Sequence, residues 1–332
     1  MPLIAEYGLF LAKTLTILLA VVFGALALTV LVGRGRQPRR DRLEVRRLNQ
    51  HYERLRDAID SQLLDKKAYR AQRKARAKTR KKGQAQDRPR VFVLDFHGDI
   101  RASRVEALRE EITALLAVAT ERDEVVVRLE SPGGLVPHYG LAASQLARVR
   151  ERGIRLTVTV DRMAASGGYL MACVADRLLA APFAMIGSIG VVAQVPNFHR
   201  LLKRHDIDYE MLTAGEYKRT LTTFGEITDK GRDKAKDELE EIHDLFKTFI
   251  RRHRADLDVN RVATGEVWLG ERALELRLVD AVTTSDDYLL QRSLEAELLL
   301  LRFHRHAPLR KRLSLSLENA LLGVRRLLAA GN

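Results

Sequence analysis

The stretch Asp161-Arg-Met-Ala-Ala-Ser-Gly-Gly-Tyr169 decides how the middle of this chain folds. It follows a β-branched run, Leu156-Thr-Val-Thr-Val160, and leads into a helix-compatible run that ends at Ala175. A strand therefore passes into a helix through a turn of small residues that contains Ser166. Small neighbours leave room for a substrate backbone, and the unpaired N–H groups of a helix N-terminus can hold an anion. The pattern fits a nucleophilic serine, but it also fits a tight turn without chemistry.

Strand patterns alternate with helix patterns on both sides of this stretch. We expect strands at residues 91–96, 125–129, 156–160, 185–192 and 209–213, and helices at 103–120, 137–150, 169–175, 196–205, 228–254 and from 268 onward. This alternation predicts an α/β domain with a mainly parallel sheet over residues 91–300. Ligands of such sheets bind at the carboxyl ends of the strands. Ser166 and the pair Gly133–Gly134 both follow predicted strands there.

A serine hydroxyl needs a general base to act as a nucleophile. The chain has neither a G-x-S-x-G elbow nor an S-x-x-K pairing, so the base must lie elsewhere. His138 is the best placed of the nine histidines, although a single helix histidine is more often a packing or surface residue. Lys218, in the turn G-E-Y-K, is the other candidate. A lysine base must lose about three pKa units, roughly 4 kcal/mol, through burial or a neighbouring cation such as Arg219. The pattern alone also fits a surface lysine.

Acyl transfer also needs backbone N–H donors for the oxyanion. Gly167 follows the candidate nucleophile, and Gly133 or Gly134 in S-P-G-G could supply a second donor, although this motif also fits a type II turn. The sequence contains no H-x-x-x-H, C-x-x-C, phosphate loop or G-x-G-x-x-G, so we expect no metal and no cofactor. The single cysteine, Cys173, excludes an internal disulfide and is expected to be buried.

The N-terminal part contains 19 consecutive residues without a charge, Thr14 to Val32. As a helix rising ~1.5 Å per residue, this run would extend roughly 28 Å, enough to cross a hydrocarbon core. A cleaved signal peptide fits less well, because its apolar run is usually ~7–15 residues and the cleavage-like Ala25-Leu26-Ala27 lies inside this run. We therefore expect residues 1–33 to form a transmembrane anchor. Five arginines follow it, and the positive-inside tendency then places the rest of the chain in the cytoplasm.

The formal charge of +14 comes from one segment of the chain. Residues 34–90 carry 21 Lys and Arg against 7 Asp and Glu, whereas the remainder has 36 of each. Apolar residues at helical spacing predict an amphipathic helix in the first half of this segment, and residues 70–82 form a dense basic run. The run fits either a solvated tether or a contact with anionic lipid headgroups, at ~1 kcal/mol per basic residue. The absence of interleaved aromatic residues argues against a nucleic-acid partner.

Five motifs in order carry a family resemblance: S-P-G-G at 131–134, M-A-A-S-G-G-Y at 163–169, G-S-I-G-V at 187–191, G-E-Y-K at 215–218, and W-L-G-E-R-A with a later L-V-D within 268–280. Together they resemble the signal peptide peptidase A family of membrane serine peptidases. One anchor, a basic spacer and a single peptidase domain are similar to its SohB-like branch. The match covers residues 91–282.

The resemblance implies a fold related to Clp protease and the crotonases, with Ser166 as nucleophile and Lys218 as general base. It also implies homo-oligomers, a bacterial inner-membrane location, and peptide substrates such as signal-peptide remnants. Known members place the catalytic domain outside the cytoplasm, opposite to the charge argument, so the membrane face stays open. The alternatives are a crotonase-type acyl-CoA enzyme and a non-catalytic membrane scaffold.

The expected division of the chain is an anchor at 1–33, a basic helical tether at 34–90, a serine peptidase domain at 91–300, and a C-terminal amphipathic helix within 301–332. Apolar residues recur at helical spacing between Leu309 and Ala330, with basic residues around them. Such a helix could pack on its own domain, on a neighbouring subunit or on the membrane.

Overall fold

The structure, a computed structural model, describes residues 7–20, 23–24, 41–84 and 88–305. The chain divides into two compact units, residues 1–42 with 304–332, and residues 43–303. In the first unit, residues 7–20 and 23–24 are helical and exposed. No helix among the described residues is both long and apolar enough to span a membrane. Most of the expected span from Thr14 to Val32, and the whole amphipathic segment from Leu309 to Ala330, lie outside the described residues.

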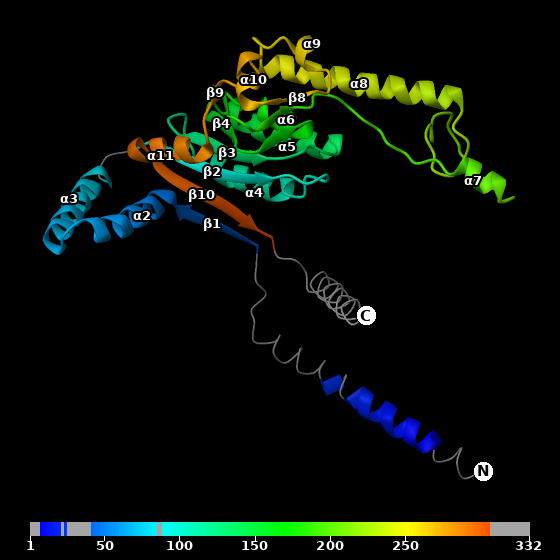
Figure 1. Cartoon of the computed structure of the whole chain (residues 1–332), viewed down its shortest axis with the longest axis horizontal. Helices are drawn as coiled ribbons and strands as arrows, with labels where there is room; N and C mark the ends of the chain where they lie inside the picture. Colours follow the sequence, from blue (N-terminus) through cyan, green and yellow to red (C-terminus); the bar gives the residue numbers. More distant parts are fainter. Residues whose placement is uncertain (1–6, 21–22, 25–40, 85–87, 306–332) are drawn as a thin grey trace. The chain divides into compact units, whose positions relative to one another are not determined.

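The second unit is built on a largely parallel sheet, as the alternating sequence pattern predicted (Figure 1). Its described strands follow the order β1 (Arg42–Arg47), β10 (Glu297–His304), β2 (Arg90–His97), β3 (Glu124–Glu130), β4 (Arg155–Val160), β6 (Arg177–Ala180) and β9 (Ala281–Val282). Every neighbouring pair from β10 to β9 is parallel. The strands therefore present their carboxyl ends along one edge of the sheet.

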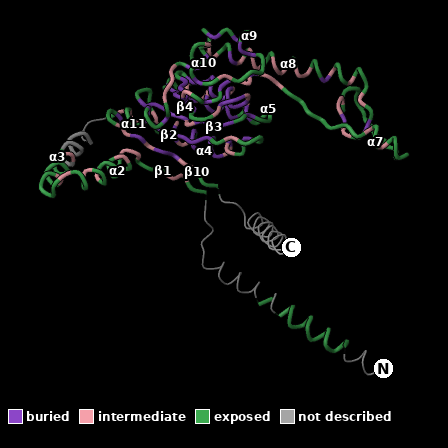
Figure 2. Tube along the Cα trace, in the orientation of Figure 1, coloured by how far each residue is buried: buried purple, intermediate pink, exposed green. Residues whose placement is uncertain are grey.

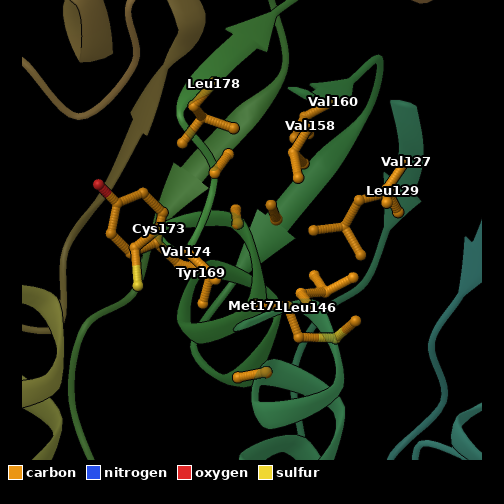
Figure 3. Close-up of a cluster of buried hydrophobic side chains, with 14 of the residues drawn as sticks. Val127, Leu129, Leu146, Val158, Val160, Tyr169, Met171, Cys173, Val174 and Leu178 are labelled. Carbon is orange, nitrogen blue, oxygen red and sulfur yellow. The ribbon is translucent and has the colours of Figure 1, made fainter. Parts of the chain in front are cut away.

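The two faces of this sheet are buried beneath different helices. Alternate residues of β2 and β3, such as Phe92, Leu94 and Val127, belong to a core shared with α4 (Val105–Leu116), α5 (Val136–Glu151) and α6 (Gly167–Ala172). Val91, Val93 and the rest of the opposite face pack against α11 (Ser285–Glu295) and the start of α2 (Leu48–Leu63). Burial on both faces explains why these strands read as continuous apolar runs. Figure 2 shows the buried centre, and Figure 3 shows the packing around α6.

A second, three-stranded sheet lies beside the carboxyl edge of β3. It consists of β5 (Met163–Ala165), β7 (Met185–Gly187) and β8 (Val267–Leu269), with β7 between the other two. A parallel bridge between Ser131 and Ala164 joins the end of β3 to β5. This bridge places the S-P-G-G motif directly beside the stretch that contains Ser166.

Residues 190–228, which we call the arm, connect β7 to α8 (Asp229–His253) and contain only the short helix α7 (His199–Arg204) (Figure 1). From residue 192 to 219 every residue is exposed except His199 and Leu202, which are half-buried. The expected strand at 209–213 is wrong, and the expected strand at 185–192 is shortened to the three residues of β7. A strand needs a neighbouring edge for its backbone, and the arm offers none at these positions.

The C-terminal end of α8 lies near the sheet, because Arg254, the residue after the helix, binds the carboxylate of Asp280. The Arg254 side chain donates to both carboxylate oxygens of Asp280, at 2.8 and 2.7 Å, and is only 10% exposed. Burial alone would raise the pKa of Asp280, but the hydrogen bonds from Arg254 and from the Leu178 N–H hold it below its usual value. We call the rest of the second unit, outside the arm, the body. The arm is therefore connected to the body by a long helix whose far end is fixed.

The first part of the expected tether is folded onto the sheet unit. Asn49 in α2 donates to the carbonyls of Ser293 and Ala296 and accepts from the Leu298 N–H. The helix α3 (Lys66–Gln84) pairs with α2 through Arg76, which lies 2.6 Å from a carboxylate oxygen of Asp60. The helix predicted in the first half of residues 34–90 is present as α2, whereas residues 42–47 of the same segment form β1. Two short helices, α9 (Val259–Val262) and α10 (Gly270–Glu275), complete the described elements of this unit.

Candidate active site

Ser166 occupies the turn between β5 and α6, as its small neighbours predicted. Its backbone has a φ of 51°, a left-handed value that is uncommon for a residue with a side chain. The Ser166 N–H donates to the carbonyl of Gly187 at 2.8 Å, and its own carbonyl accepts from the Leu170 N–H at 3.0 Å. Such a conformation costs of order 1–3 kcal/mol and tends to be kept at functional sites. The side chain is half-buried, so its hydroxyl remains within reach of a substrate.

The glycine loop that follows β3 packs directly against this turn. The Ser131 N–H donates to the carbonyl of Met163 at 2.8 Å, and the Ala165 N–H donates to the carbonyl of Ser131 at 3.0 Å. Gly133 has a φ of 86°, and a Cβ added to it would lie 2.7 Å from both the Ser166 Cβ and the Gly167 nitrogen. Any side chain at position 133 would therefore displace the candidate nucleophile.

The candidate oxyanion donors differ in whether their N–H groups already have an acceptor. The Gly133 N–H donates to Ser131 Oγ at 3.1 Å, and Gly133 is buried. Gly134 is exposed, and the described residues provide no hydrogen-bond acceptor for its N–H. Gly167 is the first residue of α6, where a backbone N–H has no partner within the helix. Of the three predicted glycines, Gly134 and Gly167 are thus the two for whose N–H groups no acceptor is recorded among the described residues.

Lys218 lies in the arm and is exposed. Its backbone N–H donates to the carbonyl of Gly215 at 3.2 Å, which closes the turn that the sequence indicated. The neighbouring Glu216 forms an ion pair with Lys230 of α8. Among the described residues, the structure records no hydrogen bond between Lys218 and Ser166. The pairing of the predicted nucleophile and base therefore stays a prediction.

The other residues singled out by the sequence are also placed by the structure. His138 is exposed in the first turn of α5, and no hydrogen bond to Ser166 is recorded for it within the described part of the chain. Cys173 is fully buried, as expected, and burial raises the pKa of its thiol. The described residues contain no cluster of His, Cys, Asp or Glu that could hold a metal ion.

Tyr139 is a residue beside the site that the sequence did not single out. It is fully buried in α5, and its ring lies where a side chain at Gly167 would have to be. A tyrosine within a helical pattern gives no signal of such a role, because that role depends on neighbours distant in sequence.

The strained serine and its glycine loop at the edge of a parallel sheet fit an enzyme of acyl transfer, and comparisons with known proteins give its class. Residues 2–146 match the family described as peptidase family S49 N-terminal, and residues 148–298 match peptidase family S49. Together with the relatives described next, these matches show that the chain belongs to peptidase family S49 and is a peptidase.

The relatives carry a common name. The "Probable protease SohB" of Haemophilus influenzae is 45% identical over 336 residues, covering 97% of this chain and 95% of that protein. The "Probable protease SohB" of Buchnera aphidicola subsp. Acyrthosiphon pisum is 53% identical over 235 residues, covering 71% of this chain and 70% of the relative. A solved structure of a 1510-N membrane-bound stomatin-specific protease mutant is 15% identical, with a TM-score of 0.42 and coverage of 62% of this chain and 86% of that one.

Proposed function

We propose that this peptidase is a serine endopeptidase in which Ser166 is the nucleophile and Lys218 the general base. One observation carries the proposal. The backbone of Gly133 lies against the Ser166 Cβ and the Gly167 nitrogen, so the glycine loop that carries the Gly134 N–H packs against the serine turn. Two backbone donors beside a strained serine are the parts that acyl transfer requires.

The proposed reaction proceeds through an acyl-enzyme. The neutral amine of Lys218 accepts the proton of the Ser166 hydroxyl as Oγ attacks the peptide carbonyl. The Gly134 and Gly167 N–H groups bind the oxyanion of the tetrahedral intermediate. Lys218 then donates its proton to the leaving amine, and the C–N bond breaks. Water, deprotonated by Lys218, hydrolyses the ester and restores Ser166.

We propose that Lys218 reaches Ser166 of a second copy of this chain. A lysine can act as a base only where desolvation or a nearby cation favours its neutral form. The arm that carries Lys218 also exposes large apolar side chains, including Leu212 (95% exposed), Val192 (76%) and Ile207 (53%). Scattered single apolar residues need no explanation, but a whole segment of them fits an interface. Assembly would bury the arm and at the same time desolvate the amine of Lys218.

The dyad is tested with alanine variants and a matched control. Ser166→Ala and Lys218→Ala should each lower casein hydrolysis by at least about a thousandfold, because neither group acts alone. Lys203→Ala removes another exposed lysine of the same arm and should keep near-normal turnover. A fluorophosphonate probe should label the unmodified protein at Ser166. Near-normal turnover by Lys218→Ala would refute the dyad, and labelling at another serine would refute the nucleophile.

Mixing the two inactive variants tests whether the base comes from a second copy. A site that takes its serine from a Lys218→Ala chain and its lysine from a Ser166→Ala chain is intact. When the two variants are mixed in equal amounts, about one site in four should recover activity. The chain that supplies Ser166 and the chain that supplies Lys218 are each the required variant in about half of the sites of a symmetric oligomer. If both residues came from the same chain, the mixture would remain inactive.

We further propose that the enzyme is anchored in a bacterial inner membrane by residues 14–32, that it cleaves peptides of the cell envelope, and that α3 contacts anionic lipid headgroups. The exposed basic residues of α3 include Lys66, Lys67, Arg70, Arg73, Lys74 and Lys78. The helix contains no acidic residue, and each basic residue near an anionic surface contributes ~1 kcal/mol. Full-length protein in anionic vesicles should resist trypsin cleavage within α3. Equal cleavage in neutral and anionic vesicles would contradict the contact.

A further inference from the structure

The hydroxyl of Tyr139 lies between the loop after β2 and the glycine loop after β3. Tyr139 Oη donates to the carbonyl of Asp99 at 2.8 Å and lies 2.6 Å from Ser131 Oγ. Both Tyr139 and Ser131 are fully buried, so neither hydroxyl exchanges these partners for water. The Gly133 N–H donates a hydrogen bond to the same Ser131 Oγ at 3.1 Å.

The donors and acceptors allow one direction for this chain of bonds. A phenol has a single proton, and the Asp99 carbonyl can only accept, so Tyr139 donates to Asp99. The Ser131 hydroxyl must then donate to Tyr139 Oη, which leaves its lone pairs to accept the Gly133 N–H. Burial raises the pKa of Tyr139, which keeps the phenol protonated. The peptide nitrogen of Gly133 is therefore tied to the loop after β2 through three aligned hydrogen bonds.

The ring of Tyr139 contacts the other half of the site. A Cβ added to Gly167 would lie 2.4 Å from Tyr139 Cγ, so the glycine backbone rests on the ring. Gly98 leaves the space for the hydroxyls, because a Cβ there would lie 2.4 Å from both Ser131 Oγ and Tyr139 Oη. Tyr139 thus supports the glycine loop through its hydroxyl and the first residue of α6 through its ring.

We propose that Tyr139 is a positioning residue for the oxyanion hole, acting through Ser131 on the Gly133 N–H, one residue before the Gly134 donor, and on Gly167 by direct contact. This inference rests on the proposed role of Ser166 as nucleophile. An oxyanion donor is effective only when it is held near its productive orientation, and losing one donor costs about 10²–10³ in kcat. A loosened donor should therefore cost less than a deleted one.

The test removes the hydroxyl and keeps the ring. Tyr139→Phe should lower kcat on a peptide substrate by about 10–100-fold, with KM within about twofold, because the oxyanion forms only after the substrate is bound. The affinity of a peptide aldehyde, whose adduct with Ser166 carries an oxyanion, should fall by a similar factor. Ser131→Ala breaks the same chain and should reproduce both effects.

Tyr288→Phe is the matched control. Tyr288 is also buried, 7% exposed, and its hydroxyl bonds to Glu124 in the core on the opposite face of the sheet. This variant should keep kcat and aldehyde affinity within about twofold, even if its melting temperature falls. The inference is overturned if Tyr139→Phe keeps its kcat, or if both variants lose kcat in proportion to their loss of melting temperature. Activity remaining in Ser166→Ala would instead overturn the proposed function.

Discussion

Ser166 and Lys218, the two residues of the proposed dyad, lie in regions that differ in how much of their structure one chain can support. Around Ser166, the buried Gly133 packs against the serine and Gly167, and Gly167 packs in turn on the ring of Tyr139. Around Lys218, the arm is exposed from residue 192 to 219, except at two half-buried positions. The comparison indicates that packing within one chain fixes the positions of the proposed nucleophile and oxyanion donors. The position of the proposed base, Lys218, depends instead on a second surface that covers the arm.

The same difference is visible in the apolar residues of the two regions. Those of the sheet alternate between two covered faces and form continuous cores. Those of the arm make only small clusters, such as the ring contacts of Phe224 with Phe198 at 6.2 Å and with Tyr209 at 5.8 Å. Each of the following changes tests whether packing within one chain explains the body but not the arm.

Gly133→Ala should have the largest effect. Its Cβ would lie 2.7 Å from the Ser166 Cβ, the Gly167 nitrogen and the Ala165 carbonyl, and its φ of 86° is itself unfavourable for alanine. We expect casein hydrolysis to fall by more than about 100-fold, since both the nucleophile and an oxyanion donor would move. Steady-state kinetics of the purified variant measures the loss.

Gly265→Ala is the control for this substitution. Gly265 has a nearly identical φ of 85°, but a Cβ there meets nothing within 4 Å. It should therefore cost only about 1 kcal/mol of stability and leave turnover close to normal. Equal losses of activity in the two variants would show that backbone conformation, and not close packing at Ser166, governs position 133.

Leu94→Ala and Leu212→Ala compare the same truncation in the two regions. Leu94 is fully buried in β2, so its replacement should lower the free energy of unfolding by about 3 kcal/mol. Leu212 in the arm is 95% exposed, and its truncation should change stability by less than about 0.5 kcal/mol. Urea unfolding measures both. A large loss at Leu212 would show that the arm is already covered in the purified protein.

Asp123 provides a pH-dependent test of the body. Burial alone would raise the pKa of this carboxyl, but hydrogen bonds from the Arg90 side chain and from the Thr120 and Arg90 N–H groups lower it to about 2. Its ordinary value is 3.8. A depressed pKa contributes stability above pH ~4, roughly 2 kcal/mol, which is lost as the pH falls from about 4 to 2.

Asp123→Asn should therefore be less stable than the unmodified protein at pH 7, and the gap should narrow between about pH 4 and 2. The free energy of unfolding in urea at several pH values measures the gap. Asp256 is an exposed aspartate in a loop, and Asp256→Asn serves as the control for the loss of a carboxylate that is not buried. A gap that stays constant down to pH 2 would contradict the role of the Asp123 charge.

The sequence predicted the parts of the fold and site that depend on local pattern. The apolar runs at 91–96, 125–129 and 156–160 became strands, and the small residues around Ser166 became the turn, because pattern and backbone requirements agree there. The bridge between Ser131 and Ala164 confirms that the two motifs meet at the strand ends. Tyr139 and the three-stranded sheet could not be found, since they depend on contacts between distant segments. The surroundings of Lys218 could not be predicted either, since we propose that a second copy of the chain provides them.

Thr228→Ala should have the smallest effect, at the junction where the arm joins the body. Thr228 is the N-cap of α8, and its hydroxyl accepts from the Gly231 N–H at 3.1 Å. Losing this cap should cost about 1 kcal/mol locally, and hydrogen exchange of the first turn of α8 should speed up accordingly. Because the other end of α8 is fixed by Arg254, the loosening should stay on the arm side and leave probe labelling of Ser166 unchanged. Slower labelling would show that the start of α8 also supports the nucleophile. The position of Ser166 would then depend on the arm side as well as on packing within the body.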